Sequence, residues 1–265
     1  KKLDKVVLGA SNQQGVWQAN VDAVQASGYA TWSASKQDLG HVTAILSRLI
    51  IPKSAANDVG DLLEGKNTTQ QIPSLDIVAE NFELFDKKLG RLELLASNSV
   101  DGNGRNWSIN KLNLKSPDAQ FNATGKWLLR ENANITNLNY VLEIADSGEL
   151  LERLDYPDVM RGGKGRLEGN IQWNGLPFLM DMPSLSGQVK MKLEAGQFLQ
   201  DVPAAAKLLG VLSMQSLPRR LTLDFRDVFS EGFAFDNVVG DAVIEQGIAR
   251  TNNFKMSSIN AAVLI

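Results

Sequence analysis

Apolar and polar residues alternate along several stretches of the chain, with the two-residue period of a β-strand that has one covered face and one face in water. In residues 185–193 the odd positions are apolar or glycine, whereas the even positions are serine, glutamine and lysine. A helix would mix the two classes on each face. The alternation recurs over residues 75–79, 92–96, 107–114, 119–129, 138–144, 165–173, 221–225 and 238–244. The pattern therefore predicts about a dozen strands or more.

Short turn signals separate the predicted strands, at residues 101–104 (DGNG), 116–118 (SPD) and 246–247 (QG). Such loops join antiparallel neighbours, so the sheet is predicted to be a meander. Similar signals near residues 11–15 and 27–28 predict that strands begin close to the N-terminus. No low-complexity linker divides the chain, and we expect one elongated β segment over residues 1–265. The long polar stretch 52–73 is interpreted as a mobile connection within it.

Three short helices are predicted from capping and stop signals. Asn57 caps the first, over residues 58–64, and Ser147 caps the second, which ends before Pro157. The third covers residues 203–216 and is apolar around much of its circumference, which is typical of a helix buried on more than one side or offered to a partner. Three roles stay open for it: a cap over the sheet, insertion into a membrane interface, or binding of a partner protein.

Three short helices cannot cover a sheet of this size. Twelve strands spaced about 4.8 Å apart give a width of about 58 Å, whereas a 14-residue helix is only about 21 Å long. The apolar face must close into a barrel, pair with a second sheet, or curve into a trough that holds an apolar ligand. Small residues at inward positions leave room in a trough, although glycine also marks bends and bulges; they are Ala119, Ala123, Gly165, Gly169 and Gly187.

These observations favour a mainly β fold: a long curved antiparallel β-meander that forms a hydrophobic groove, resembling an open barrel or β-taco, with about three short helices. The longest apolar runs fall short of the roughly 20 residues that a membrane-spanning helix needs. The chain has no initiator methionine and no signal peptide, and its last residues, AAVLI, have the pattern of a strand. We therefore expect the chain to be part of a longer protein.

Composition narrows the possible functions. The 265 residues include 27 basic and 30 acidic side chains, so no basic surface of the kind that binds nucleic acid is expected. The absence of cysteine excludes disulfides and thiol catalysis, and a single histidine, His41, argues against imidazole catalysis and metal binding. No cofactor or metal is predicted. Asp224 and Asp227 could serve as a glycosidase acid and base, but paired acids are common on sheet surfaces and this interpretation is disfavoured.

Residues 217–236, LPRRLTLDFRDVFSEGFAFD, form a long and specific sequence segment. With RGGKGRLEGNIQW at 161–173 and PSLSGQVKMKLEAGQFL at 183–199, this segment resembles the C-terminal periplasmic region of YhdP-type members of the AsmA-like family. Residues 75–94 resemble the same family more weakly, and the first 70 residues resemble it mainly in their general pattern of residues.

The resemblance implies a bridge-like lipid transport protein in the envelope of a Gram-negative bacterium. In such a protein, phospholipids move along a hydrophobic β-groove through the periplasm toward the outer membrane, and a helix outside this fragment anchors the protein in the inner membrane. The family supplies no catalytic residues, so non-enzymatic phospholipid transport is expected. The expected partners are phospholipid, the membrane through parts outside the fragment and through helix 203–216, and envelope proteins.

On this hypothesis, inward apolar side chains are the candidate lipid-binding residues: Leu167, Ile171, Trp173, Val189, Met191, Leu193, Leu221, Leu223, Phe225, Phe233 and Phe235. The phenylalanines fit an acyl path and a packed core equally well. Arg219 and Arg220 are candidate headgroup contacts, because arginine binds phosphate in a bidentate manner. Pairing of these arginines with nearby carboxylates is the favoured alternative.

Two other functions remain open from the sequence. A structural or assembly factor would close its strands into a sandwich or barrel and would dock an outer-membrane or envelope partner through helix 203–216. A sugar-binding or hydrolytic β domain is the less favoured of the two, since the chain lacks a clustered acidic site.

Overall fold

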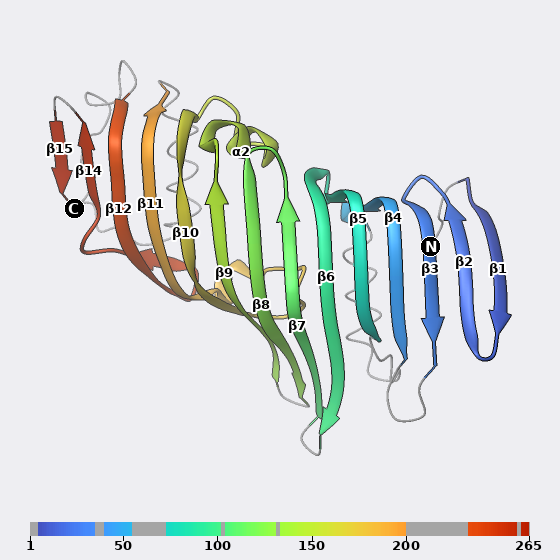
Figure 1. Ribbon diagram of the computed structural model, residues 1–265. Helices are drawn as coiled ribbons and strands as arrows, with labels where there is room; N and C mark the ends of the chain where they lie inside the picture. The colour runs from blue at the N-terminus through green and yellow to red at the C-terminus, as the bar shows by residue number, and fades with distance from the viewer. Residues whose placement is uncertain are drawn as a thin grey trace. The chain divides into compact units, whose positions relative to one another are not determined.

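A computed structural model describes residues 5–34, 40–54, 73–101, 104–130, 133–199, 233–258 and 261–264. Nearly all of these residues lie in strands, and Figure 1 labels all of the strands except β13. The strands are β1 (Val7–Gln13), β2 (Val16–Asp22), β3 (Ala26–Ser33), β4 (His41–Ile51), β5 (Ser74–Leu84), β6 (Lys87–Asp101), β7 (Gly104–Lys115), β8 (Ala119–Arg130), β9 (Ala133–Ile144), β10 (Met160–Asn174), β11 (Ser186–Phe198), β12 (Phe233–Glu245), β13 (Ile248–Arg250), β14 (Lys255–Ser258) and β15 (Ala261–Leu264).

Each strand pairs with its neighbour in the sequence from β1 to β12, after which β12 pairs with both β13 and β14, and β14 pairs with β15. The order starts at β1 and ends at β15, and in the described part of the chain these two strands do not pair to close a barrel. The predicted mainly β meander is therefore confirmed.

One pair departs from the antiparallel expectation. β4 and β5 run parallel, with His41 opposite Ser74 and Ile51 opposite Leu84. Parallel neighbours need a crossover of a dozen residues or more, and residues 52–73, most of which lie outside the described residues, supply that length. The mobile connection and the helix 58–64 that were predicted for this stretch did not include a change in strand direction.

Most predicted turns lie between strands, at 116–118 and 246–247 and, near the N-terminus, at Gln14 and Gly15. The signal at residues 27–28 instead lies inside β3, where a β-bulge shifts the register against β4. Gly28 has φ +143°, and a Cβ there would lie 2.4 Å from the carbonyl oxygen of Ile45. This glycine therefore permits a close approach of two strands and does not form a turn.

The second predicted helix is present as α2 (Ser147–Arg153), but its cap is Asp146 and not Ser147. An Asp146 carboxylate oxygen accepts hydrogen bonds from the backbone N–H groups of Gly148 (2.9 Å) and Glu149 (3.1 Å). Ser147 is buried, and its hydroxyl has no hydrogen-bond partner within the described structure. A short 3-10 helix, η1 (Met182–Ser184), was not predicted. The predicted helices 58–64 and 203–216 lie outside the described residues.

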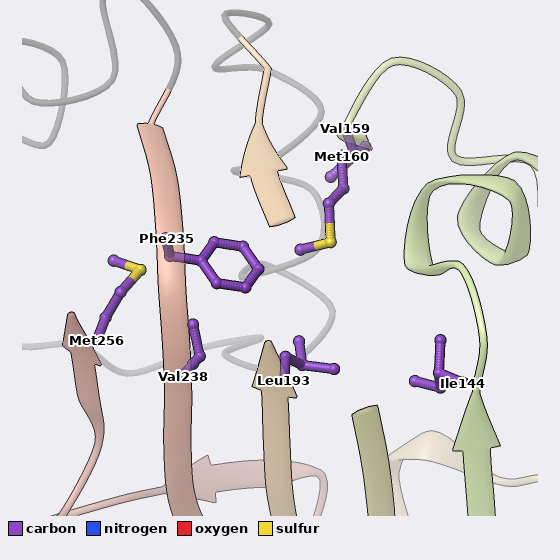
Figure 2. Packing of buried hydrophobic residues seen from close by; sticks show 7 residues of the cluster. All are labelled: Ile144, Val159, Met160, Leu193, Phe235, Val238 and Met256. Carbon is purple, nitrogen blue, oxygen red and sulfur yellow. The ribbon is translucent and has the colours of Figure 1, made fainter. Parts of the chain in front are cut away.

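The chain divides into two compact units. The N-terminal unit comprises residues 1–116, 122–136 and 175–179, and the C-terminal unit comprises residues 117–121, 137–174 and 180–265. The core of the N-terminal unit lies on β4, β5 and β6: Ala44, Leu46, Ala79, Phe82 and Leu92. The core of the C-terminal unit is shown in Figure 2: Ile144, Val159, Met160, Leu193, Phe235, Val238 and Met256.

Candidate functional site

Strand register in the N-terminal unit aligns apolar side chains into rows that cross the strands. We call these rows the N-terminal apolar face. The middle row is Ala10, Ala19, Ala30, Ala44, Ile77, Leu94 and Leu112. On the side of the β1–β2 turn lies the row Asn12, Trp17, Trp32, Val42, Leu75, Ala96 and Ile109, and on the other side lies the row Leu8, Val21, Gly28, Leu46, Ala79, Leu92 and Leu114. Rows two residues apart along a strand are spaced about 7 Å.

Part of this face is open to solvent. Leu8 is 60% exposed, Trp17 50% and Trp32 39%. Trp17 and Trp32 lie opposite each other, and adjacent apolar side chains with this exposure are typical of a binding surface, whereas isolated exposed ones such as Leu8 are ordinary. The sequence analysis did not single them out, although Trp17, Ala19 and Val21 alternate with polar residues in the usual strand pattern.

The opposite face of the same strands carries charge. Arg91 donates a hydrogen bond to Glu80 (Nε–Oε1 3.1 Å) and another to Glu93, which also accepts one from Lys111. The hydrogen bonds from Lys111 and Arg91 lower the pKa of Glu93. Hydrogen bonds to the two glutamates raise the pKa of Arg91. The polar face is therefore matched in charge, while the N-terminal apolar face carries no charged side chain in its three rows.

The C-terminal unit repeats this separation of faces on β10 and β11. Leu167 lies opposite Met191, and Gly169 lies opposite Val189. On the other face Arg166 pairs with Glu143 and with Glu168 (Nη2–Oε2 2.8 Å). Hydrogen bonding to Glu168 and the charge of Glu143 raise the pKa of Arg166.

Glycines on the apolar side of β10 and β11 mark close contacts between strands. A Cβ on Gly165 would lie 2.0 Å from the carbonyl oxygen of Lys192, and one on Gly169 would lie 2.0 Å from that of Gln188. Gly187 is equally close to the backbone of β10. These glycines are required by the approach of the backbones, which supports their interpretation as bends over that of empty space for a ligand.

The predicted lipid-binding and headgroup residues fall into four groups. Leu167, Ile171, Val189 and Met191 are half-buried on the common apolar side of β10 and β11. Trp173 is 1% exposed, and Leu193 and Phe235 belong to the packed core of Figure 2. Phe233 lies in β12 opposite Phe198, and its side chain is not described. Leu221, Leu223, Phe225, Arg219 and Arg220 lie outside the described residues.

Phe235 shows how a candidate lining residue is packed. Its ring centroid lies 5.3 Å from that of Phe198. Figure 2 shows the Phe235 ring directed toward Met160, which comes from the start of β10. A Cβ added to Gly196 would lie 2.5 Å from the ring. The Phe235 side chain therefore fills the core of the C-terminal unit, and the half-buried Leu167 and Met191 pack against the same core.

An ion pair that the sequence analysis missed fixes α2 to the start of β8. The guanidinium Nε of Arg153 donates to both carboxylate oxygens of Asp118, at 2.8 and 3.1 Å. The Asp118 side chain is 2% exposed. Hydrogen bonding to Asp118 raises the pKa of Arg153. The pair stabilises the helix that packs against the core of the C-terminal unit through Leu150 and Leu151.

Within the described ranges, no group of three or more His, Asp or Glu side chains is placed to hold a metal ion. His41 lies at the start of β4 opposite Ser33. No helix among the described residues has both the length and the apolar character needed to cross a bilayer.

Comparisons with known proteins give a consistent result. The family model described as "YhdP protein" matches residues 1–265. The chain is similar to a protein of Escherichia coli (strain K12) named "Intermembrane phospholipid transporter YhdP", with 23% identity over 202 residues. The match covers 74% of this chain and 16% of that relative, so the chain corresponds to a small part of its length. No solved structure matches the chain.

Proposed function

Because the chain belongs to the YhdP protein family, we propose that it conducts phospholipid without enzymatic activity, holding acyl chains on its apolar faces while headgroups stay in water. The relative from Escherichia coli is named as an intermembrane phospholipid transporter. The single observation that carries the proposal is the set of apolar rows across β1 to β7, which includes the exposed side chains of Leu8, Trp17 and Trp32.

The physical basis of the proposal is the hydrophobic effect. Transfer of an acyl chain from an apolar surface to water costs about 0.8 kcal/mol for each exposed methylene. A row that crosses the strands offers the chain similar apolar contacts at each step of about 4.8 Å from strand to strand. Movement along the row therefore breaks no specific polar contact, whereas departure from the row exposes methylenes.

The proposed setting is the periplasm of a Gram-negative bacterium, within a longer protein anchored in the inner membrane by a segment outside this chain. The resemblance supports this setting, and so does the name of the relative from Escherichia coli, an intermembrane phospholipid transporter. Contact of residues 203–216, which lie outside the described residues, with a membrane or with an envelope protein belongs to the same proposal.

Photo-crosslinking in the full-length protein tests lipid contact directly. Photoreactive residues at Ile171 and Val189 occupy the half-buried apolar side, and matched controls at Gln172 and Lys190 occupy the exposed polar side of the same two strands. We expect phospholipid adducts at the first two positions and none at the controls. Equal labelling of both faces, or no adduct at any position in folded protein, would contradict the proposal and favour a structural or assembly role.

A further inference from the structure

The tryptophans of the N-terminal unit gather at one end of its strands. Trp17 is the second residue of β2 and lies opposite Trp32, the second-last residue of β3. Trp107 follows the start of β7 by three residues and lies opposite Asn98 on β6, one row beyond Ala96. Trp127 precedes the end of β8 by three residues. We call these four residues the tryptophan rim.

The indole rings lie on the apolar side, and the N–H groups of Trp32, Trp107 and Trp127 lie near the strand ends. Trp107 is 8% exposed and its Nε1 donates to the carbonyl oxygen of Pro73, the residue before β5, at 3.4 Å. Trp127 is 5% exposed and its Nε1 donates to Oδ1 of Asn134 at 2.6 Å. The Nε1 of Trp32 lies near Gly40, the residue before β4. A Cβ added to Gly40 would lie 3.0 Å from this nitrogen.

The opposite end of these strands has a different chemistry. Arg48 and Asp22 approach to 3.8 Å, and Lys53 and Asp86 approach to 3.2 Å. Tryptophan has an apolar ring with a single N–H donor at its edge, and it is therefore enriched where hydrocarbon meets water. The N-terminal apolar face thus has ion pairs at one end of its strands and, at the other end, tryptophan on β2, β3 and β7, with Trp127 on the adjoining β8.

We propose that the tryptophan rim holds the interfacial part of a bound phospholipid, its glycerol esters and phosphate, and so sets the polarity of the lipid on the face. Acyl chains extend from the rim over the middle row of the N-terminal apolar face. Trp17 and Trp32, which are about half exposed, contact the lipid directly, whereas Trp107 and Trp127 are buried, donate their N–H groups within the chain and stabilise the same end of the sheet. This inference rests on the proposed phospholipid transport.

Fluorescence quenching by spin-labelled phosphatidylcholine tests the polarity. The full-length protein is loaded with lipid that carries the nitroxide on the headgroup, near the ester end of an acyl chain, or near its methyl end. The difference in quenching between the unmodified protein and the variant Trp17→Phe/Trp32→Phe isolates the two exposed indoles. Ile45→Ala is the matched control, because Ile45 is 63% exposed on the other face of β4.

We expect the headgroup and ester-end labels to quench this difference signal several-fold more than the methyl-end label, and Ile45→Ala to leave the pattern unchanged. Equal or stronger quenching by the methyl-end label overturns the rim and leaves phospholipid transport intact. Absence of quenching by every label overturns the rim as well. If Ile171 and Val189 then still crosslink lipid, only the rim fails, and if they do not, the proposed function fails with it.

Discussion

Replacement of Phe235 by alanine distinguishes a packed core from a lipid-lining surface. Phe235 is 2% exposed and packs against Phe198 and the backbone of Gly196. Transfer of a buried phenylalanine side chain to water costs about 1.5–3 kcal/mol, and the cavity left behind raises the total cost of Phe→Ala to about 3–5 kcal/mol. We expect the variant to lose this much local stability whether or not lipid is bound.

Hydrogen exchange measured by mass spectrometry gives the local readout, because it reports the opening of β11 and β12 without requiring one transition for the whole chain. A loss of about 3 kcal/mol corresponds to faster amide exchange by about two orders of magnitude in these strands. Val243→Ala on β12, where the side chain is 46% exposed, should change exchange by less than about threefold. A similarly small effect of Phe235→Ala, with loss of lipid crosslinking, would refute the assignment of Phe235 to the core.

Three further substitutions, two of them with a matched control variant, test local features by the same exchange measurement. Asp146→Ala should cost about 1 kcal/mol in α2 through loss of the N-cap, whereas Ser147→Ala should cost little, because its hydroxyl has no hydrogen-bond partner; the reverse order would contradict the assigned cap. Arg153→Ala should destabilise α2 by about 3 kcal/mol, because it leaves a buried carboxylate unpaired. Gly165→Ala should disrupt the pairing of β10 and β11, whereas Gly9→Ala in β1, where a Cβ meets no atom within 4 Å, should be tolerated; equal effects would argue against the close approach.

From β5 to β12, strand positions and their inward faces followed from alternation, because a period of two is visible within a single strand. For β1 to β4 only turn signals near the N-terminus indicated strands. Alternation does not reveal what covers a face. Leu193 and Phe235 look like Ile171 in the sequence, yet they are buried by residues from β9, β12, β14 and the segment that follows α2. These partners are far apart in the sequence, so their arrangement depends on tertiary packing that no local pattern contains.

The cap of α2 shows a local ambiguity that long-range contact resolves. Asp146 and Ser147 are both good cap residues, and the sequence does not decide between them. The carbonyl oxygen of Asp118 accepts hydrogen bonds from the N–H groups of Ala145 (2.8 Å) and Asp146 (3.2 Å). These bonds hold Asp146 in an extended conformation, with φ −147° and ψ 112°. The helix therefore begins at Ser147, one residue earlier than a Ser147 cap would give.

Register, and not alternation alone, makes the rows of the N-terminal apolar face continuous. A slip of one residue between two strands would turn every side chain of one strand to the wrong face. Alternation breaks in β4, β5 and β7, where the apolar positions step by three residues, as from Leu46 to Leu49. Each break coincides with a register shift against a neighbouring strand, at Ser27/Gly28, Ala79/Phe82 and Leu95/Ala96.

Each shift removes a polar residue from the apolar face. Without the shift between β6 and β7, Ala96 would lie opposite Asn110, whereas with it Ala96 lies opposite Ile109. Asn110 instead donates a hydrogen bond to Ser97 Oγ at 3.0 Å, and Asn81 donates to the carbonyl oxygen of Ser47 at 2.8 Å. The displaced polar side chains therefore stabilise the irregular backbone that displaced them. The proposed lipid path across the N-terminal apolar face therefore depends on these bulges. They restore the register between strands at each point where the alternation within one strand is interrupted.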